Sequence, residues 1–339
     1  SYNQNLGNIL LDIDCFKSFK TEPFFKNYVQ AIKFIPSFQS FGFGQYYLHF
    51  VPNDIDQFDF PHFLHNSFQS IKYPAGFDRL QPFLVKYIWP YQNPNDKILN
   101  WLRSKGHLRE YCLFFVKKVV HFFHINYNLD VKGWDLNPDR FKLYFQNILF
   151  NKDYDLTLPP MKEFNVGDLK TTTYFSPQSS EYEALTELYD IKPIDIKSHL
   201  GTRNYRKVNF ISDLLERKLI YPFISFKNCG LNKKITLILP DLSTKTLQKL
   251  KKIFSFFNKG VLYEIEGEYY INGLDEVIKF ESGLMIKLYL PHDDLNPFIQ
   301  NFTLLFEYFD IKHYIIQHNV VSGENLLKSV FNNLDFLIQ

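Results

Sequence analysis

Two spacings of apolar residues alternate along the C-terminal half of the chain. Short continuous apolar runs, typical of buried strands, stand at residues 234–239 and 284–290. Between them, Leu247, Leu250 and Phe257 recur at the spacing that places side chains on one face of an α-helix. The full order of expected elements is strand 234–239, helix 244–257, strand 261–271, strand 284–290, helix 297–309 and strand 312–319. This βαββαβ order predicts a four-stranded antiparallel sheet with two helices on one face, the ferredoxin-like arrangement.

The N-terminal half repeats this order of elements. Its expected elements are strand 46–51, helix 58–68, strand 70–73, strand 83–89, helix 96–105 and strand 109–119. Landmarks also recur in the same order. For example, a predicted strand that runs from Gly to Pro stands at 44–52 and again at 230–240. A repeat at a shift of about 190–200 residues indicates that the two halves are duplicates.

A basic amphipathic helix is predicted at residues 202–219, where Val208, Ile211 and Leu219 form its apolar face. Predicted helices at 181–189 and 193–200 precede it, Gly201 supplies a sharp turn, and an extended stretch follows at 220–226. This order is that of a winged helix-turn-helix, whose last helix enters the major groove of DNA. Arg, Lys and Asn contact phosphates and base edges there. The expected DNA-binding residues are Thr202, Arg203, Asn204, Arg206, Lys207 and Asn209. The alternative is a surface helix whose charges only solvate it.

The corresponding segment of the first half is poorer in these features. Helices are predicted at residues 6–19 and 24–34, and the second carries few basic groups. Helix-turn-helix units usually need a third helix to close their core, so we predict a degenerate winged helix at the N-terminus.

The fold predicted for the whole chain is α+β: two tandem copies of a winged helix-turn-helix followed by a ferredoxin-like βαββαβ domain. One more helix follows each copy, at 138–150 and 324–338, and the Pro- and Thr-containing stretch 151–180 is the most linker-like. The predicted segments are a degenerate winged helix (1–41), ferredoxin-like domain 1 (42–121), a helix and linker (122–179), the winged helix-turn-helix (180–228), ferredoxin-like domain 2 (229–321) and a C-terminal helix (322–339).

Composition excludes several classes of protein. Of 339 residues, 45% are hydrophobic and 22% charged, which provides for a packed core and argues against global disorder. The formal net charge of +2 means that any surface for nucleic acid is local. Cys15, Cys112 and Cys229 have neither disulfide-scaffold nor zinc-site spacing. The chain also has no apolar run of about 20 residues and no signal-peptide pattern, so we expect a cytoplasmic protein that spans no membrane.

The order of elements resembles that of the leucine-responsive/AsnC-type transcriptional regulators of archaea and bacteria. The resemblance is carried by residues 185–201 and 202–219, the wing 220–226 and the βαββαβ unit from 230 to 321. It implies sequence-specific binding to double-stranded DNA, a homodimer formed through the sheets, and a small-molecule effector between them. It implies no enzymatic activity and no cofactor. The chain departs from the family in carrying two copies and in lacking a clear glycine-rich effector loop.

Motifs for phosphate-binding loops, hydrolase elbows and zinc proteases are absent from the sequence. The histidine pairs His62/His65 and His121/His124 have no supporting carboxylate or Cys, so we predict no metal site. The main alternative function is a small-molecule-binding or enzymatic protein without DNA binding, similar to siroheme decarboxylases, which also consist of two related halves. Its candidate pocket residues are His49, Arg79, Arg109 and His121. A third possibility is a structural protein that assembles through its sheets.

Overall fold

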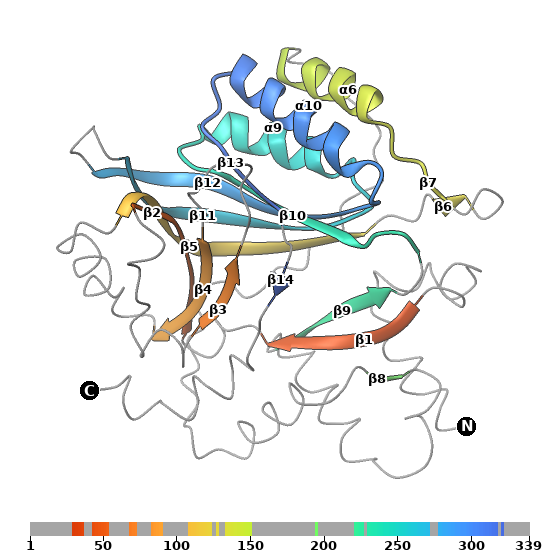
Figure 1. The fold of residues 1–339 in the computed structure, drawn as a ribbon, viewed down its shortest axis with the longest axis horizontal. Coiled ribbons are helices and arrows are strands. Elements are labelled where there is room, and N and C mark those ends of the chain that lie inside the picture. The colour runs from red at the N-terminus through yellow and green to blue at the C-terminus, as the bar shows by residue number, and fades with distance from the viewer. Residues whose placement is uncertain are drawn as a thin grey trace, which may run out of the picture.

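Most of the described strands form a single antiparallel sheet. The computed structural model describes residues 29–36, 43–53, 68–72, 83–90, 108–123, 127–128, 133–150, 194–195, 220–226, 229–271, 277–317 and 320–321. Nine of the strands in these ranges pair in the order β13-β10-β12-β11-β5-β2-β4-β3-β14. Three helices, α6, α9 and α10, lie together on one face of the part of the sheet made by β10 to β13 (Figure 1).

The second half has the predicted βαββαβ order. Its elements are β10 (Lys233–Leu239), α9 (Thr244–Phe254), β11 (Lys259–Ile271), β12 (Val277–Leu290), α10 (Leu295–Tyr308) and β13 (Tyr314–Gln317). The spatial order β13-β10-β12-β11 places the first and third strands at the centre, as a ferredoxin-like unit requires. The sequence-based end of α9 was wrong by three residues. The helix ends at Phe254, because the Ser255 hydroxyl donates to the carbonyl of Lys252 at 2.6 Å and competes with the helical backbone.

The described strands of the first half repeat this spatial order. They are β2 (Phe43–Pro52), β3 (Phe68–Lys72), β4 (Phe83–Pro90) and β5 (Leu108–Phe123), arranged as β5-β2-β4-β3. Of the two helices predicted here, residues 58–67 and 96–105 lie outside the described residues, and Phe68 belongs to strand β3 instead of the helix. Strand β5 pairs with β11 along its length, with Cys112 opposite Tyr269 and Val120 opposite Leu262. The two halves therefore share one sheet.

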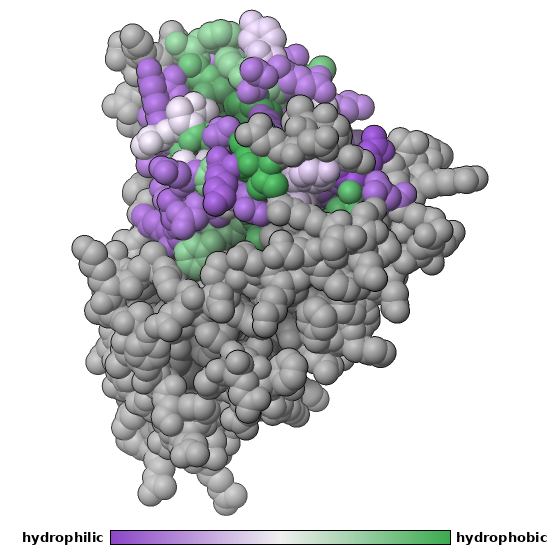
Figure 2. All heavy atoms as spheres, turned by 90° about the vertical axis from the view of Figure 1, so that its left-hand side faces the viewer, coloured by the Kyte–Doolittle hydropathy of each residue, from purple (hydrophilic) through white to green (hydrophobic). Residues whose placement is uncertain are grey.

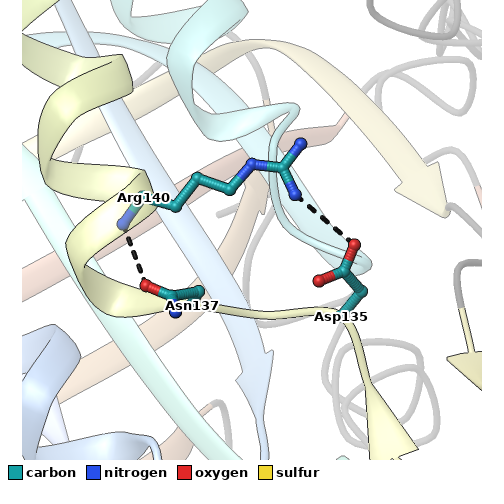
Figure 3. Close-up of polar contacts among 3 residues, drawn as sticks. All are labelled: Asp135, Asn137 and Arg140. Atoms are coloured by element: carbon teal, nitrogen blue, oxygen red, sulfur yellow. Dashed lines mark hydrogen bonds and ion pairs between the residues drawn. The ribbon is translucent and has the colours of Figure 1, made fainter.

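The helix α6 (Pro138–Phe150) joins the two halves in a second way. Its start follows from the sequence, since the Asn137 side chain accepts the Arg140 backbone N–H at 2.9 Å and Pro138 occupies the first helical position (Figure 3). The Arg140 guanidinium also lies 3.4 Å from the Asp135 carboxylate. Although α6 follows the strands of the first half in the chain, it packs against α9 and α10 of the second half. Phe141 has the ring centroids of six other phenylalanines between 5.0 and 6.4 Å from its own.

Two hydrophobic cores lie on opposite faces of the sheet. The core on the helical side gathers residues such as Leu237, Leu262 and Ile286 from the strands with the buried faces of the three helices. The other core includes Met285 and Val261 on the face without helices. The large hydrophobic side chains that are exposed in the described part all come from α6 and α10, namely Leu143, Phe150, Leu304 and Tyr308. Viewed from the side, hydrophobic residues also show at the top of the molecule, in the region of the helices, above a band of hydrophilic ones (Figure 2).

Two helices predicted from the sequence contain residues that form strands instead. Strand β1 (Val29–Pro36) pairs with β9 (Ile220–Phe226) and with β8 (Ile194–Asp195). The predicted helix at 24–34 is therefore wrong from residue 29 onward, where Val29, Ile32 and Ile35 favour a strand. The predicted helix at 193–200 is wrong at residues 194–195, which pair with β1. The predicted wing at 220–226 is extended, as expected for it. Two further strands, β6 (Tyr127–Asn128) and β7 (Gly133–Trp134), form a small hairpin of their own.

Candidate functional site

The face of the second half's sheet that carries no helices is rich in Lys and Tyr. Side chains alternate along a strand, so Lys234 and Thr236 of β10 share this face with Lys287 and Tyr289 of β12. Strand β11 adds Lys259 and Tyr263, and strand β2 of the first half adds Gln45 and Tyr47. We call the group of Lys234, Lys259 and Lys287, with Tyr47, Tyr263 and Tyr289, the basic face.

Lys287 contacts two tyrosines of the basic face. It is 9% exposed, and its Nζ donates a hydrogen bond of 2.8 Å to the hydroxyl of Tyr47. The same Nζ lies 4.6 Å from the ring centroid of Tyr47 and 4.9 Å from that of Tyr263, within the range of cation–π attraction. Gln45 Nε2 donates to the Tyr47 hydroxyl at 3.0 Å. Because Tyr47 comes from β2 and Lys287 from β12, the two halves of the chain build this cluster jointly.

A second cluster of the basic face surrounds Tyr289. Lys259 Nζ lies 4.3 Å from the Tyr289 ring centroid, and Lys234 is paired with Tyr289 in the β10–β12 register. Burial lowers the pKa of Lys234 to about 8 and raises the pKa of Tyr289 to about 12. Burial also raises the pKa of Tyr263. The ammonium group of Lys234 thus sits where water solvates it poorly.

The acidic side chains of β11 are directed elsewhere. Glu264 accepts from Lys251 of α9 at 2.7 Å, on the helical side of the sheet. Glu266 lies 3.1 Å from Lys117, and Glu268 accepts the Tyr111 hydroxyl at 3.0 Å. Around the three lysines, at residues 233–236, 259–264 and 285–290, the described strands therefore present no carboxylate on the basic face.

A smaller polar group lies beside the basic face, two residues further along β2. His49 is 3% exposed, and its ring centroid lies 4.6 Å from that of Tyr314 in β13. The chain reaches β13 through a Schellman motif at the end of α10, where Asp310 takes a positive φ of 51° and the Ile311 N–H donates to the carbonyl of Phe306 at 2.8 Å. This turn fixes the position of Tyr314.

The predicted DNA-binding residues Thr202, Arg203, Asn204, Arg206, Lys207 and Asn209 lie outside the described residues. DNA binding by this segment therefore stays a prediction.

The pocket residues predicted for the alternative function are brought together only in part. His49 lies in the polar group beside the basic face, whereas Arg109 is exposed and lies where the register between β2 and β5 shifts. His121 lies inside β5 opposite Val261, not after the end of the strand as the sequence suggested. Arg79 lies outside the described residues, as do His62, His65 and His124.

Sequence reasoning missed the lysines of the basic face. The signal was available in the strand patterns, because Lys287 interrupts the apolar run LMIKLYL and Lys234 begins KITLIL. A lysine at an inward position of a buried strand is unusual and marks a position to examine.

Neither a cluster of metal-binding side chains nor a membrane-spanning helix is found among the described residues. No group of three or more His, Cys, Asp or Glu side chains in these ranges is placed to hold a metal ion. No helix in the described part of the chain is both long enough and apolar enough to cross a bilayer.

The fold and this site define a mixed α/β protein built on an antiparallel sheet. No known protein-family profile matches the sequence, and no curated protein matches it. Among solved structures, the chain is similar to the siroheme decarboxylase NirDL in co-complex with an iron-uroporphyrin III analogue, at 9% identity and a TM-score of 0.39 over 96% of this chain and 90% of that one. It is similar to the siroheme decarboxylase NirDL in a second structure, at 9% identity and a TM-score of 0.38 over 98% and 89%. Scores this low say nothing about activity.

Proposed function

We propose that the protein binds a small organic anion that bears carboxylate groups, at the basic face. The observation that carries the proposal is the convergence of three ammonium groups on one face of β10, β11 and β12, whose described residues present no acid there. Lys234 is the most informative of the three, because burial lowers its pKa and no described carboxylate offsets this effect.

Electrostatics favours an anion at this position. Transferring a charge from water into a protein interior costs several kcal/mol unless an opposite charge accompanies it. With a pKa of about 8, Lys234 is still about nine-tenths protonated at pH 7, so its charge is present under ordinary conditions. A carboxylate within about 4 Å supports the charged form and raises this pKa. Binding such a ligand therefore relieves a cost that the folded protein bears by itself.

The chemistry of the face favours an organic carboxylate over an inorganic phosphate. The lysines stand among apolar side chains such as Val261 and Met285 and beside tyrosine rings, which suit a carbon skeleton. Helix N-termini and arginines are the groups that most often hold phosphates, and the described strands β10 to β12 present neither on this face.

Binding is tested with citrate and with a polycarboxylate porphyrin, using inorganic phosphate as the comparison. Heat of binding and thermal stability are measured for the parent, for Lys234→Met and for the control Lys245→Met, whose side chain is exposed on α9. We expect Lys234→Met to weaken carboxylate binding about tenfold, which corresponds to about 1.4 kcal/mol. The control should bind like the parent. The proposal fails if neither carboxylate binds the parent, or if Lys234→Met binds as tightly as the parent does.

This site is compatible with two interpretations of the chain. If the chain is a regulator of the leucine-responsive type, the anion is its effector, and helix 202–219 binds DNA. If the chain is a small-molecule-binding or enzymatic protein similar to siroheme decarboxylases, the anion is its ligand or substrate. A salt-titrated assay with duplex DNA distinguishes them, since phosphate contacts produce a linear fall of log affinity with log salt concentration.

A further inference from the structure

The two buried polar atoms of the His49–Tyr314 pair have no hydrogen-bond partner in the described part of the chain. They are the Nδ1 atom of His49 and the hydroxyl oxygen of Tyr314. The two rings pack against each other, with their centroids 4.6 Å apart and an interplanar angle of 40°. The pair draws on both halves of the protein, because His49 lies in β2 and Tyr314 in β13.

Leaving such atoms unpaired is costly. A buried donor or acceptor without a partner destabilises the fold, and most buried polar atoms in folded proteins are hydrogen-bonded. Two such atoms, on side chains whose rings pack together, mark a place where a polar group from outside the protein is accommodated. Neither of these two atoms forms a hydrogen bond in the described part of the chain, and the packing of the two rings needs neither of them.

The charges around the pair are balanced, in contrast to the basic face. Lys312 Nζ lies 3.2 Å from the ring centroid of Tyr269 and is the cation on this side. The carboxylates of Glu110 and Asp241 act on Lys312 and offset its charge. Burial lowers the pKa of His49 to about 4, which keeps its imidazole neutral at ordinary pH. A neutral hydrogen-bonding group therefore fits better than a second carboxylate.

We propose that His49 and Tyr314 bind a hydroxyl group of the same ligand whose carboxylates occupy the basic face. This inference rests on the proposed function and specifies its ligand as a hydroxycarboxylate. A hydroxyl group both donates and accepts, so it matches the pair in either tautomer of His49. The distance is suitable, because Tyr47 and His49 stand two residues apart on one face of β2, a separation of about 7 Å. A ligand of citrate size spans that length.

The test compares citrate with propane-1,2,3-tricarboxylate, which has the same three carboxylates and no hydroxyl. Affinities are measured calorimetrically for the parent, Tyr314→Phe, His49→Phe and Lys234→Met. The parent should prefer citrate about tenfold, and Tyr314→Phe and His49→Phe should each remove most of that preference by weakening citrate alone. Lys234→Met should weaken both ligands equally and keep the preference.

The outcomes separate the two proposals. If both ligands bind the parent equally, or if Tyr314→Phe keeps the preference for citrate, the hydroxyl site is refuted. The proposal that carboxylates bind at the basic face is then unaffected. If neither ligand binds, both proposals are refuted.

A stability comparison checks the pair independently of any ligand. The Tyr263 hydroxyl has a partner in Tyr47, so Tyr263→Phe should lower the melting temperature. Tyr314→Phe deletes a hydroxyl without a partner in the described residues and should leave the melting temperature unchanged or raise it. A loss in Tyr314→Phe equal to that in Tyr263→Phe would show that the Tyr314 hydroxyl serves the fold, and would overturn the inference.

Discussion

The burial of His49 predicts a specific loss of stability in mild acid. In the folded protein burial lowers the pKa of His49 to about 4, whereas an unfolded histidine titrates near 6.5. Between these values the unfolded chain binds a proton that the folded chain does not bind. The free energy of unfolding therefore falls as the pH drops below about 6.5, and this contribution levels off below about 4.

The two pKa values set the size of this effect. At pH 5 the unfolded state gains about 2 kcal/mol from protonating this histidine, and at pH 7 the gain is only a few tenths of a kcal/mol. The variant His49→Phe has no such group. Its free energy of unfolding should therefore rise relative to that of the parent by about 2 kcal/mol when the pH is changed from 7 to 5.

Urea unfolding at several pH values between 7 and 4, followed by circular dichroism, measures this difference. Burial raises the pKa of Glu110 and of Asp294, so both carboxyls also titrate abnormally. They are present in parent and variant alike, so the difference between the two proteins isolates His49. A difference that stays constant from pH 7 to pH 5 would refute the assignment of a buried, neutral His49.

Three further predictions test the fold and the predicted helix. Phe141→Ala should lower the free energy of unfolding by about 3–5 kcal/mol, because it empties the centre of the packing between α6 and the second half. Leu143→Ala, on the exposed side of the same helix, should change it by less than about 0.5 kcal/mol in the same urea titration. Gly267→Ala should destabilise the protein by about 1–3 kcal/mol, measured in the same way, because its Cβ would meet the backbone of β5. Arg203→Ala and Arg206→Ala should each weaken duplex DNA binding by about 1–3 kcal/mol at matched salt, and unchanged binding in the double variant would end the regulator hypothesis.

Local signals in the sequence were sufficient to predict several elements. Helix α6 was predicted with both of its ends, because Asn137 caps it, Pro138 opens it and four apolar residues at helical spacing form its buried face. The strands and helices of the second half were predicted in the right order, because their apolar runs differ clearly in period. Each of these elements is specified by its own residues, and a single sequence is enough to show them.

Features that depend on distant partners were not predictable. The spacing of apolar residues at 29–34 allows a helix or a strand, and pairing with β9 selects the strand over the predicted helix. Residues 194–195 pair with β1 from far along the chain, so they also became extended against a local helical pattern. The basic face was missed for the same reason. Lys234 and Lys287 belong to strands that only the sheet brings together, and the Tyr47 hydroxyl that receives Lys287 comes from the other half.

The shared sheet explains why the candidate site draws residues from both halves of the chain. Pairing of β5 with β11 joins the two halves into one sheet, in which Tyr47 and His49 of β2 contact Lys287 and Tyr314 of the second half. In two separate and identical domains such a site would occur twice, each copy built within one domain or across a symmetric interface. When two halves belong to one chain, each can supply different side chains to a shared site. Here the first half supplies a tyrosine and a histidine, and the second half supplies the lysines. The contact between Lys287 and Tyr47 thus belongs to a cluster that neither half forms alone.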